Sequence, residues 1–360
     1  MDSYLCDIIM LTHNNLDTTK KCLESFISST KIPCQLIIID NASSDGTPQY
    51  LLSLQNKKDY PLKVILNGEN KGFIRGINQG IAISKAPYVC LANNDLIFTT
   101  GWLDEIILLF EKNSQIGILN PNSNNLGVLP ISGASLAEFS EKLRKKYSGV
   151  FIEMPFDIGF CMVIRRELID KIGGLAEELC PMFFEDSDYS LRAHQAGYLV
   201  GVARGSYVLH KEHVSISQLG PEKEEIFKRS RKTYLKKWGK ALRIAWILDS
   251  YEKVKSNLLE AIRLAREGNY IWFFTREELI REDIFKASHF FEHSGIQFIK
   301  FKNFVDLAWK IFKKKKKYDL IITDSNFLQK VFRKLNYNVD SLADKEVINK
   351  IKFFDKEVKL

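Results

Sequence analysis

The sequence predicts an α/β protein with a mostly parallel central sheet, followed by a second, smaller α/β domain. Apolar strand segments alternate with helical segments over the first hundred residues. Three of these strands end in polar, acidic loops, and ligand sites of open α/β sheets lie at such strand ends. The alternation starts again after a boundary near residues 235–242. We therefore expect parallel pairing in both parts, with right-handed crossovers in the first.

Helix caps and apolar runs define the elements of the first part. Thr18-Thr19 and Asp45-Gly46-Thr47-Pro48 offer N-terminal caps for the first two helices. A segment rich in Gly, Ser and Asn reaches about residue 136, and we expect a loop or lid there. We expect strands at 5–11, 36–40, 62–66, 88–92, 156–164, 198–203 and 207–209, and helices at 16–29, 46–56, 73–84, 101–113, 166–173 and 183–196.

The second part, residues 241–360, repeats the alternation after a first domain at 1–240. No Gly-rich phosphate loop follows any of its expected strands. Its role therefore stays open among acceptor recognition, dimerisation and approach to a membrane. We expect strands at 242–248, 270–274, 296–301 and 319–323, and helices at 252–267, 283–293, 303–315 and 326–335.

Composition describes a folded chain long enough for two domains, with 360 residues, 45% apolar and 27% charged. No stretch approaches the roughly 20 apolar residues that a membrane span needs. The start Met1-Asp-Ser lacks a basic region ahead of an apolar core, so we expect a cytoplasmic protein. The six cysteines show no Cys-x-x-Cys spacing, which is typical of buried residues or free thiols rather than of a zinc site.

The net charge of +8 is concentrated in two clusters, Arg229–Lys237 and Lys313–Lys317. Such clusters are either solvated helix faces or surfaces attracted to anionic lipid or to a phosphate-bearing acceptor. The second alternative would hold the protein at the inner face of the cell membrane. We expect no nucleic-acid partner, because no helix-turn-helix, finger or RNP-like pattern accompanies the charge.

Six polar segments follow one another in the first 210 residues. They are Ile9-Met-Leu-Thr12-His-Asn14, Ile38-Ile-Asp40-Asn-Ala-Ser-Ser-Asp45-Gly-Thr47, Asn70-Lys-Gly72-Phe73 with Asn78-Gln-Gly80, Asn93-Asn94-Asp95, Phe184-Glu185-Asp186-Ser-Asp188 with Leu191-Arg192, and His210. In this order they resemble the family 2 glycosyltransferases with a GT-A fold, over about residues 5–235. The resemblance implies an inverting, metal-dependent transferase. It would move a sugar from a UDP- or dTDP-sugar to a hydroxyl of a glycan, lipid-linked or protein acceptor.

The resemblance implies a donor pocket at the first strand ends. Its nucleoside walls would be Thr12, Asn14, Asp40 and Asp45, with Asp40 accepting hydrogen bonds from the base or ribose. An alternative for Asp40 is a turn or helix-capping role. Further along, Gly72 would let the backbone approach the nucleotide without a Cβ clash, and Asn78 would orient this segment. Asn-Lys-Gly is also a good turn by itself.

Asn93-Asn94-Asp95 takes the place of the family's Asp-x-Asp metal motif. Asn93 and Asn94 are assigned to the donor, because an amide carries no charge, and Asp95 is the expected carboxylate ligand. His210 matches a position where related enzymes supply a further ligand. The ion would be Mn²⁺ or Mg²⁺, which both prefer oxygen ligands. His210 also opens a His-x-x-His-x-Ser pattern with His213 and Ser215, which resembles the rhamnosyl- and galactofuranosyl-transferase branch.

Asp186 is the expected general base, because the acceptor hydroxyl must lose its proton as it attacks the anomeric carbon. Glu185 and Asp188 lie close in sequence, and like charges raise a carboxyl pKa. Acids at a helix start also stabilise the helix dipole, which is the structural alternative. Asp188, Trp102 and Gly159 are weaker candidates for acceptor or sugar contacts, with a core role as the alternative for Trp102 and Gly159.

Other functional classes fit the sequence less well. A dinucleotide dehydrogenase needs Gly-x-Gly-x-x-Gly after the first strand, and Thr12-His-Asn-Asn-Leu-Asp17 contains no glycine. A nucleotidyltransferase would carry a Gly-rich basic loop at the same place. A catalytically inactive sugar-nucleotide-binding scaffold is favoured only by the uncharged Asn93. The retained Asp95, Asp186 and His210 speak against it.

Overall fold

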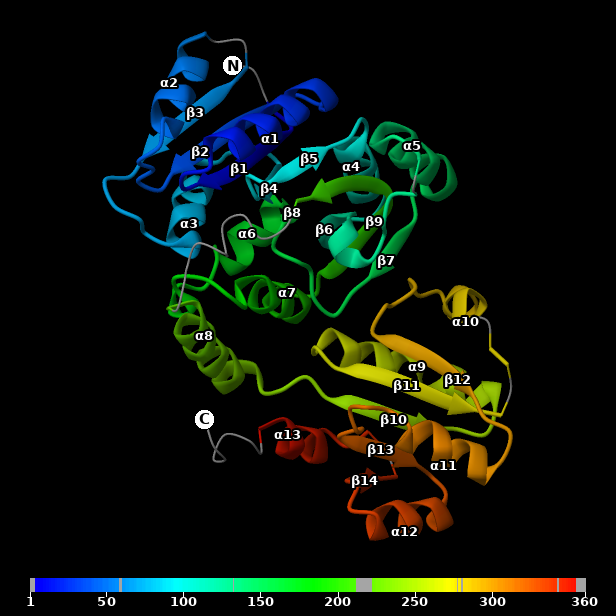
Figure 1. Ribbon diagram of the computed structural model, residues 1–360. Coiled ribbons are helices and arrows are strands. Elements are labelled where there is room, and N and C mark those ends of the chain that lie inside the picture. The colour runs from blue at the N-terminus through cyan, green and yellow to red at the C-terminus, as the bar shows by residue number, and fades with distance from the viewer. Residues whose placement is uncertain are drawn as a thin grey trace. The chain divides into compact units, whose positions relative to one another are not determined.

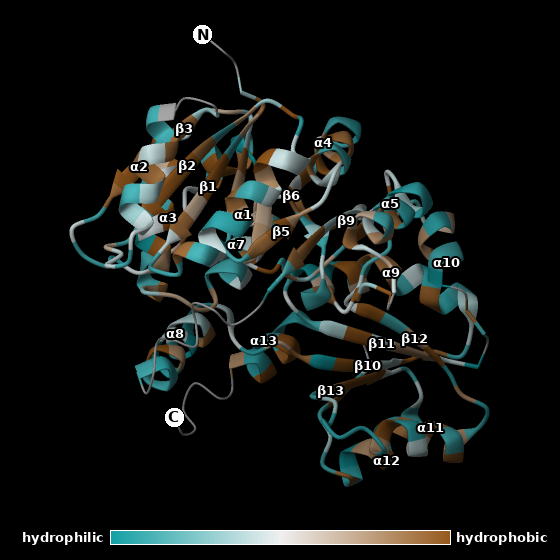
Figure 2. Cartoon of the chain, turned by 45° about the horizontal axis from the view of Figure 1, so that its top comes forward, coloured by the Kyte–Doolittle hydropathy of each residue, from teal (hydrophilic) through white to brown (hydrophobic). Residues whose placement is uncertain are grey.

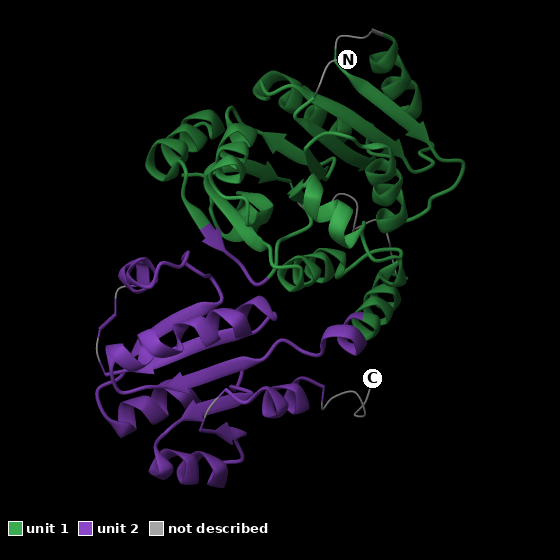
Figure 3. Cartoon of the chain, turned by 180° about the vertical axis from the view of Figure 1, so that it is seen from behind, with its two compact units in different colours: residues 1–151, 156–233 green, residues 152–155, 234–360 purple. Residues whose placement is uncertain are grey.

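The computed structural model describes residues 4–57, 60–131, 133–211, 222–276, 278–279, 281–341 and 343–353. The chain divides into two compact units (Figure 3). Unit 1 comprises residues 1–151 and 156–233, and unit 2 comprises residues 152–155 and 234–360. Among the described residues, none of the helices combines the length and apolar character that a membrane span requires.

In unit 1, the described strands form a nine-stranded sheet with the order β3-β2-β1-β4-β8-β6-β9-β5 and with β7 off this path (Figure 1). Strands β3, β2, β1 and β4 pair in parallel, whereas β8 runs antiparallel to both β4 and β6. The strands are β1 (Cys6–Thr12), β2 (Cys34–Asp40), β3 (Leu62–Leu66), β4 (Tyr88–Ala92), β5 (Leu96–Phe98), β6 (Ile116–Asn122), β7 (Phe151–Glu153), β8 (Cys161–Arg165) and β9 (Leu199–His210).

Helices cover both faces of this sheet, because successive strand residues point to opposite sides. On one face, Ile8 and Met10 of β1 share a core with α1, α2 and α4. On the other face, Gly80 of α3 lies so close to β1 that a Cβ there would be 2.4 Å from the Ile9 side chain. The helices are α1 (Leu16–Ser29), α2 (Thr47–Lys57), α3 (Phe73–Ile83), α4 (Trp102–Lys112), α5 (Leu136–Tyr147), α6 (Arg166–Ile172), α7 (Glu185–Gln195) and α8 (Glu222–Trp238).

The strand order reverses at β1, which positions the site. The chain moves outward from β1 to β2 and β3 and then returns to place β4 on the other side of β1. Thr12 pairs with Asp40, and Met10 pairs with Ala92, so the three strands end at one rim. Ligand sites lie at such a switch point.

The predicted fold class is confirmed, and the elements predicted in the first hundred residues lie within about two residues of their predicted bounds, although β5 was not predicted. Three predictions for unit 1 differ. The strand predicted at 156–164 begins only at Cys161, because Asn120 holds the preceding backbone through Ile158. The two strands predicted at 198–203 and 207–209 are one strand, β9. Helix α5 was not predicted, although Ser135 and Glu138 form a capping box at its start.

Unit 2 is a five-stranded, all-parallel sheet with the order β12-β11-β10-β13-β14. The predicted second parallel α/β unit is therefore confirmed, although β14 and α13 were not predicted. The predicted helix 303–315 ends at Phe312, before the lysine run. The strands are β10 (Arg243–Ile247), β11 (Tyr270–Thr275), β12 (Ile296–Lys300), β13 (Leu320–Thr323) and β14 (Val339–Asp340). The helices are α9 (Tyr251–Arg266), α10 (Arg281–Ala287), α11 (Phe304–Phe312), α12 (Asn326–Lys334) and α13 (Lys345–Phe353).

Candidate active site

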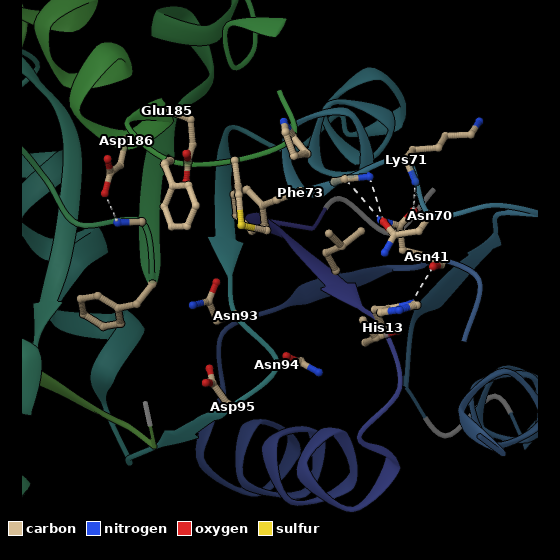
Figure 4. Close-up of a pocket in the computed structure, with 18 of the residues that line it drawn as sticks. His13, Asn41, Asn70, Lys71, Phe73, Asn93, Asn94, Asp95, Glu185 and Asp186 are labelled. Atoms are coloured by element: carbon tan, nitrogen blue, oxygen red, sulfur yellow. Dashed lines mark hydrogen bonds between the residues drawn. The ribbon is translucent and has the colours of Figure 1, made fainter. Parts of the chain in front are cut away.

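A cavity of about 1070 Å³ opens in unit 1 at the rim where β1, β2 and β4 end. Figure 4 shows Glu185 and Asp186 on one side of it and His13 and Asn70 on the other, with Asn93 between them. The predicted site residues that line it are Thr12, Asn14, Gly72, Asn93, Asn94, Asp95, Gly159, Glu185, Asp186 and His210.

Two predicted site residues, Asp40 and Asp45, do not line the cavity but lie behind its wall near Thr12 and Asn14. Asp40 is buried, and its carboxylate accepts hydrogen bonds from Thr12 Oγ1 at 3.2 Å and from the Ser43 amide at 2.9 Å. Asp45 accepts from the Leu16 amide at 2.9 Å and from the Thr47 hydroxyl at 2.6 Å. Its carboxylate thereby joins the starts of α1 and α2. Both aspartates shape the loops behind the cavity wall.

Asn41 organises this wall, and the sequence analysis did not single it out. Its Nδ2 donates to Asn70 Oδ1 at 2.7 Å, and its Oδ1 accepts from the Lys71 amide at 3.0 Å. Its carbonyl lies 2.8 Å from His13 Nδ1. Asn41 directly follows β2, and that position is the signal that could have identified it. Lys71 lines the cavity, and within the described part of the chain its side chain has no acidic partner.

Gly72 has a φ of +80°, in the left-handed region that favours glycine. A Cβ there would lie 2.6 Å from the Pro181 Cβ, so this glycine is required by packing as well as by backbone conformation. Asn78 does not line the cavity. Its amide bridges the backbone N and O of Leu175 at 2.9 Å each and braces α3 against the segment after α6.

The predicted metal ligands lie together. Asp95 Oδ1 and His210 Nε2 are 3.0 Å apart, yet they do not meet hydrogen-bond geometry, so the buried Oδ1 has no hydrogen-bond partner among the described residues. Two neighbouring ligands of an octahedral ion bound at about 2.1 Å are about 3 Å apart. Asn94 donates instead to Thr19 Oγ1 at 3.0 Å. The pair fits Mn²⁺ or Mg²⁺, and the described chain contributes no third acid, cysteine or histidine.

His210 is held by two neighbouring asparagines that the sequence analysis missed. Asn124 clamps the His210 backbone, accepting from its amide at 2.9 Å and donating to its carbonyl at 2.8 Å. The Asn125 amide nitrogen contacts His210 Nδ1, while the buried Asn125 Oδ1 has no hydrogen-bond partner among the described residues. With the amide turned over, Oδ1 accepts from Nδ1–H and leaves Nε2 free to bind a metal.

The predicted base stands at the start of α7. Asp186 Oδ2 accepts from the Gly159 amide at 3.0 Å, and Oδ1 accepts from the Ser187 amide at 2.6 Å. Burial raises the pKa of Asp186 despite these hydrogen bonds. Burial also raises the pKa of Glu185, with a further contribution from the charge of Asp186. A third acid, Asp157, is buried, and its pKa is raised by burial and then by the charge of Asp186. Neither of its carboxylate oxygens has a hydrogen-bond partner among the described residues.

The backbone before α7 is unusual. Phe183 and Phe184 both have positive φ, at 77° and 67°, which is rare for bulky residues and concentrates at functional sites. Their rings lie 5.5 and 5.2 Å from the Phe227 ring of α8. This packing supports the turn that carries Glu185 and Asp186 to the cavity.

Two of the weaker acceptor candidates lie outside the cavity lining. Trp102 is 1% exposed in the core, and its Nε1 donates to Thr30 Oγ1 at 2.9 Å. Asp188 is fully buried and pairs with Arg192 at 2.8 Å. Both positions follow helical periodicity, which turns their side chains toward the core. His213 and Ser215 lie outside the described residues.

Fold and cavity define an α/β protein with a polar site at a topological switch point. Residues 7–173 match the family model described as Glycosyl transferase family 2.

Individual proteins are similar to parts of this chain. An uncharacterized protein y4gI of Sinorhizobium fredii is 25% identical over 256 residues, which are 65% of this chain and 27% of that protein. The N-acetylglucosaminyl-diphospho-decaprenol L-rhamnosyltransferase of Mycobacterium tuberculosis is 24% identical over 241 residues, 57% of this chain and 76% of that protein. The chain thus spans about a quarter of the first relative and about three quarters of the second. The solved mannosyltransferase PcManGT from Pyrobaculum calidifontis, in complex with GDP-Man and Mn2+, is 14% identical with a TM-score of 0.49 over 66% of each chain.

Proposed function

We propose that this protein is an inverting glycosyltransferase that moves a sugar from a UDP- or dTDP-sugar to a hydroxyl of a glycan, lipid-linked or protein acceptor. One observation carries the proposal. The partly buried acids Glu185 and Asp186 and the pair Asp95 and His210 border the same cavity as the predicted nucleoside wall. The family match over residues 7–173 supports the reaction class. The rhamnosyltransferase relative, whose name states a diphospho-decaprenol acceptor, favours a lipid-linked acceptor.

The donor diphosphate would face Asp95, His210 and Lys71. When bound by Asp95 and His210, Mn²⁺ or Mg²⁺ would neutralise the negative charge of the diphosphate leaving group. Lys71, which also lines the cavity, would add a positive charge. Thr12 and Asn14 line the end of the cavity that we assign to the nucleoside.

Asp186 would take the proton from the acceptor hydroxyl. The Gly159 amide donates to its Oδ2, and the Ser187 amide and hydroxyl both donate to its Oδ1, so the carboxylate is fixed and Oδ2 keeps a lone pair for the proton. The acceptor oxygen bonds to the anomeric carbon while the bond from that carbon to the diphosphate oxygen breaks. The nucleoside diphosphate leaves with the electron pair. A single displacement of this kind inverts the anomeric configuration.

The scaffold alternative rests on Asn93 alone. This amide Nδ2 lies 3.5 Å from His210 Nε2, at the long limit of a hydrogen bond. Asp95 and Asp186 are both present and aimed into the cavity. These contacts favour an active enzyme over a scaffold.

A donor screen tests the proposal. UDP-, dTDP- and GDP-sugars are incubated with the full chain and Mn²⁺, and release of nucleoside diphosphate is measured. We expect release with one nucleotide class, its loss with EDTA and its return with Mn²⁺ or Mg²⁺. Asp95→Asn should raise the metal concentration needed, and Asp104→Asn, an exposed acid on α4, is the matched control. Full activity in EDTA would remove the metal from the proposal, and binding of a donor without turnover would favour the scaffold.

A further inference from the structure

Unit 2 exposes large apolar side chains on two adjacent helices. We call them the aromatic patch: Phe304, Val305, Trp309 and Phe312 on α11, and Phe327 on α12. Val305 is 75% exposed, Phe327 is 62% exposed and Trp309 is 55% exposed. The rings of Phe304 and Phe327 lie 5.6 Å apart, edge to face, and link the two helices. Figure 2 shows apolar segments on both α11 and α12.

Helix α11 is apolar in two directions. Leu307 and Ile311 are buried and anchor it to the core of unit 2. At 3.6 residues per turn, the patch residues form a second, broader face beside the buried one. Only Asp306 and Lys310 separate the two faces on the far side, and they pair with each other at 2.9 Å. A helix that only had to cover its sheet would need one apolar face, so the second face indicates a further apolar environment.

Positive charge surrounds the patch. The five lysines Lys313–Lys317 follow α11 directly and are all exposed. Within the part of the chain that the structure describes, none of them forms an ion pair. Lys330, Arg333 and Lys334 extend the positive charge along α12. The nearby Asp306 is neutralised by Lys310, and Asp324 is occupied by Lys253 at 2.8 Å.

Aromatic and basic groups are also interleaved. Lys313 Nζ lies 4.2 Å from the centre of the Trp309 ring, so a cation and an indole share one point of the surface. Trp and Phe with flanking Lys are the composition of helices that lie in a membrane interface, with the rings at the headgroup boundary and the lysines on lipid phosphates. A second copy of the chain would bring two lysine runs face to face, and that repulsion opposes a symmetric dimer through this patch.

We propose that the aromatic patch and the Lys313–Lys317 run dock this protein on the surface of an anionic lipid bilayer. The apolar side chains of the patch would be buried reversibly in the membrane interface. The lysines would restrict docking to membranes with negatively charged lipids. The inference is independent of the transferase reaction, because the proposed reacting groups all belong to unit 1 and the docking groups to unit 2.

Sedimentation of the full chain with vesicles tests the proposal. Vesicles of phosphatidylcholine alone are compared with vesicles that also contain phosphatidylglycerol. We expect binding to the anionic vesicles only, and its loss as the ionic strength rises from about 0.05 M to about 0.5 M. Lys314→Glu with Lys316→Glu should weaken binding more than tenfold, because each lysine near the surface contributes about fivefold. Trp309→Ser with Phe327→Ser should weaken it at least as much.

Matched controls separate docking from general surface properties. Lys232→Glu with Lys236→Glu makes the same charge change on α8, and Leu259→Ser removes a side chain that is 64% exposed on α9. Both control variants should bind like the unaltered protein. Equal loss in the α8 variant, or no binding of the unaltered protein to anionic vesicles, would overturn the proposal. Light scattering provides the other contradicting outcome: a dimer that Trp309→Ser with Phe327→Ser dissociates would make the partner a second copy.

Discussion

Both units are α/β sheets with polar residues at the carboxyl ends of their parallel strands, but they use these residues differently. In unit 1 the strand ends border a cavity of about 1070 Å³. In unit 2 the ends of β10 and β13 carry Asp249 and Asp324, and Lys253 bridges them at 2.9 and 2.8 Å. A much smaller pocket, of about 150 Å³, lies in unit 2 beside Thr275. Strand topology predicts where a site lies, and the pairing of its polar groups decides whether a ligand finds free donors and acceptors.

The contrast extends to what each unit leaves exposed to a partner. Unit 1 leaves buried carboxyl oxygens of Asp95, Asp157 and Glu185 without hydrogen bonds among the described residues. Unit 2 pairs its buried acid, because Glu153 contacts Arg266 through both carboxylate oxygens. At its surface, unit 2 exposes the apolar side chains of the aromatic patch and the lysines beside it. A small polar ligand suits the first unit, and an extended amphipathic surface suits the second.

The largest effect should come from Asp186→Asn. An amide cannot accept the proton of the acceptor hydroxyl, so kcat should fall by about 10²–10⁴. Donor affinity should stay within about threefold, because a base for the acceptor barely contacts the nucleotide. Turnover and donor binding by calorimetry are measured on the same preparation, with Asp104→Asn as the control. Collapse of donor binding together with turnover would reassign Asp186 to the donor pocket or to the fold.

The pH profile of the unaltered enzyme sharpens the same prediction. Asp186 must be ionised to act as a base, and burial raises its pKa above the ordinary 3.8. Activity should therefore rise with pH along an acid limb that lies above the range of an exposed aspartate. A rate that stays flat down to about pH 4 would contradict this role.

The next effect concerns stability and belongs to unit 2. Arg266→Gln leaves the buried Glu153 charge without its partner, because Arg266 Nη2 lies 3.0 Å from Glu153 Oε2. Removing one partner of a buried pair costs about 3–5 kcal/mol, and the one-third exposure of Arg266 lowers our expectation to about 2–4 kcal/mol. Denaturant unfolding measures the loss. The double variant Glu153→Gln with Arg266→Gln should recover part of the lost free energy of unfolding. If Arg266→Gln alone were as stable as the unaltered protein, the pair would be solvated.

The sequence identified the site through strand ends, because short-range pattern decides where a strand stops. Asp40 and Asp95 were predicted in this way, whereas Asp186, at the start of α7, was predicted from the family resemblance. The pairing of Asp95 with His210, more than a hundred residues away, was likewise predicted only from the order of the family's segments. Asn125 and Asn41 were missed, because their contacts depend on loops whose conformation no local pattern predicts. Trp102 was considered for a contact with the sugar or acceptor, with a core role as the alternative, and its ring lies in the core. The sequence around a helix start does not tell which way an aromatic ring points.

Asn125→Ala should have a smaller effect, on metal affinity. Removing the partner of His210 Nδ1 frees the ring orientation, and groups that support a ligand typically change metal affinity by about 10–100-fold. We expect about tenfold weaker Mn²⁺ binding, read from the electron paramagnetic resonance of the free ion. Asn125→Asp keeps an acceptor for Nδ1–H and should bind Mn²⁺ at least as tightly as the unaltered chain. Equal weakening by both variants would mean that Asn125 shapes the loop rather than the histidine.

The smallest effect compares two buried aspartates within unit 1. Asp157 has a folded-state pKa well above its ordinary 3.8, so the folded protein loses stability as pH rises from about 4 toward that raised value. Asp157→Asn removes the cost of ionising this buried carboxyl. It should raise the free energy of unfolding at pH 7 by on the order of 1 kcal/mol, with no gain at pH 4. Asp188→Asn should do the opposite, because it takes a charge away from Arg192. Thermal unfolding at both pH values gives the comparison. Destabilisation by Asp157→Asn at pH 7 would show that the ionised carboxylate has a partner in solution, and a simultaneous loss of turnover would make Asp157 a positioning residue for Asp186.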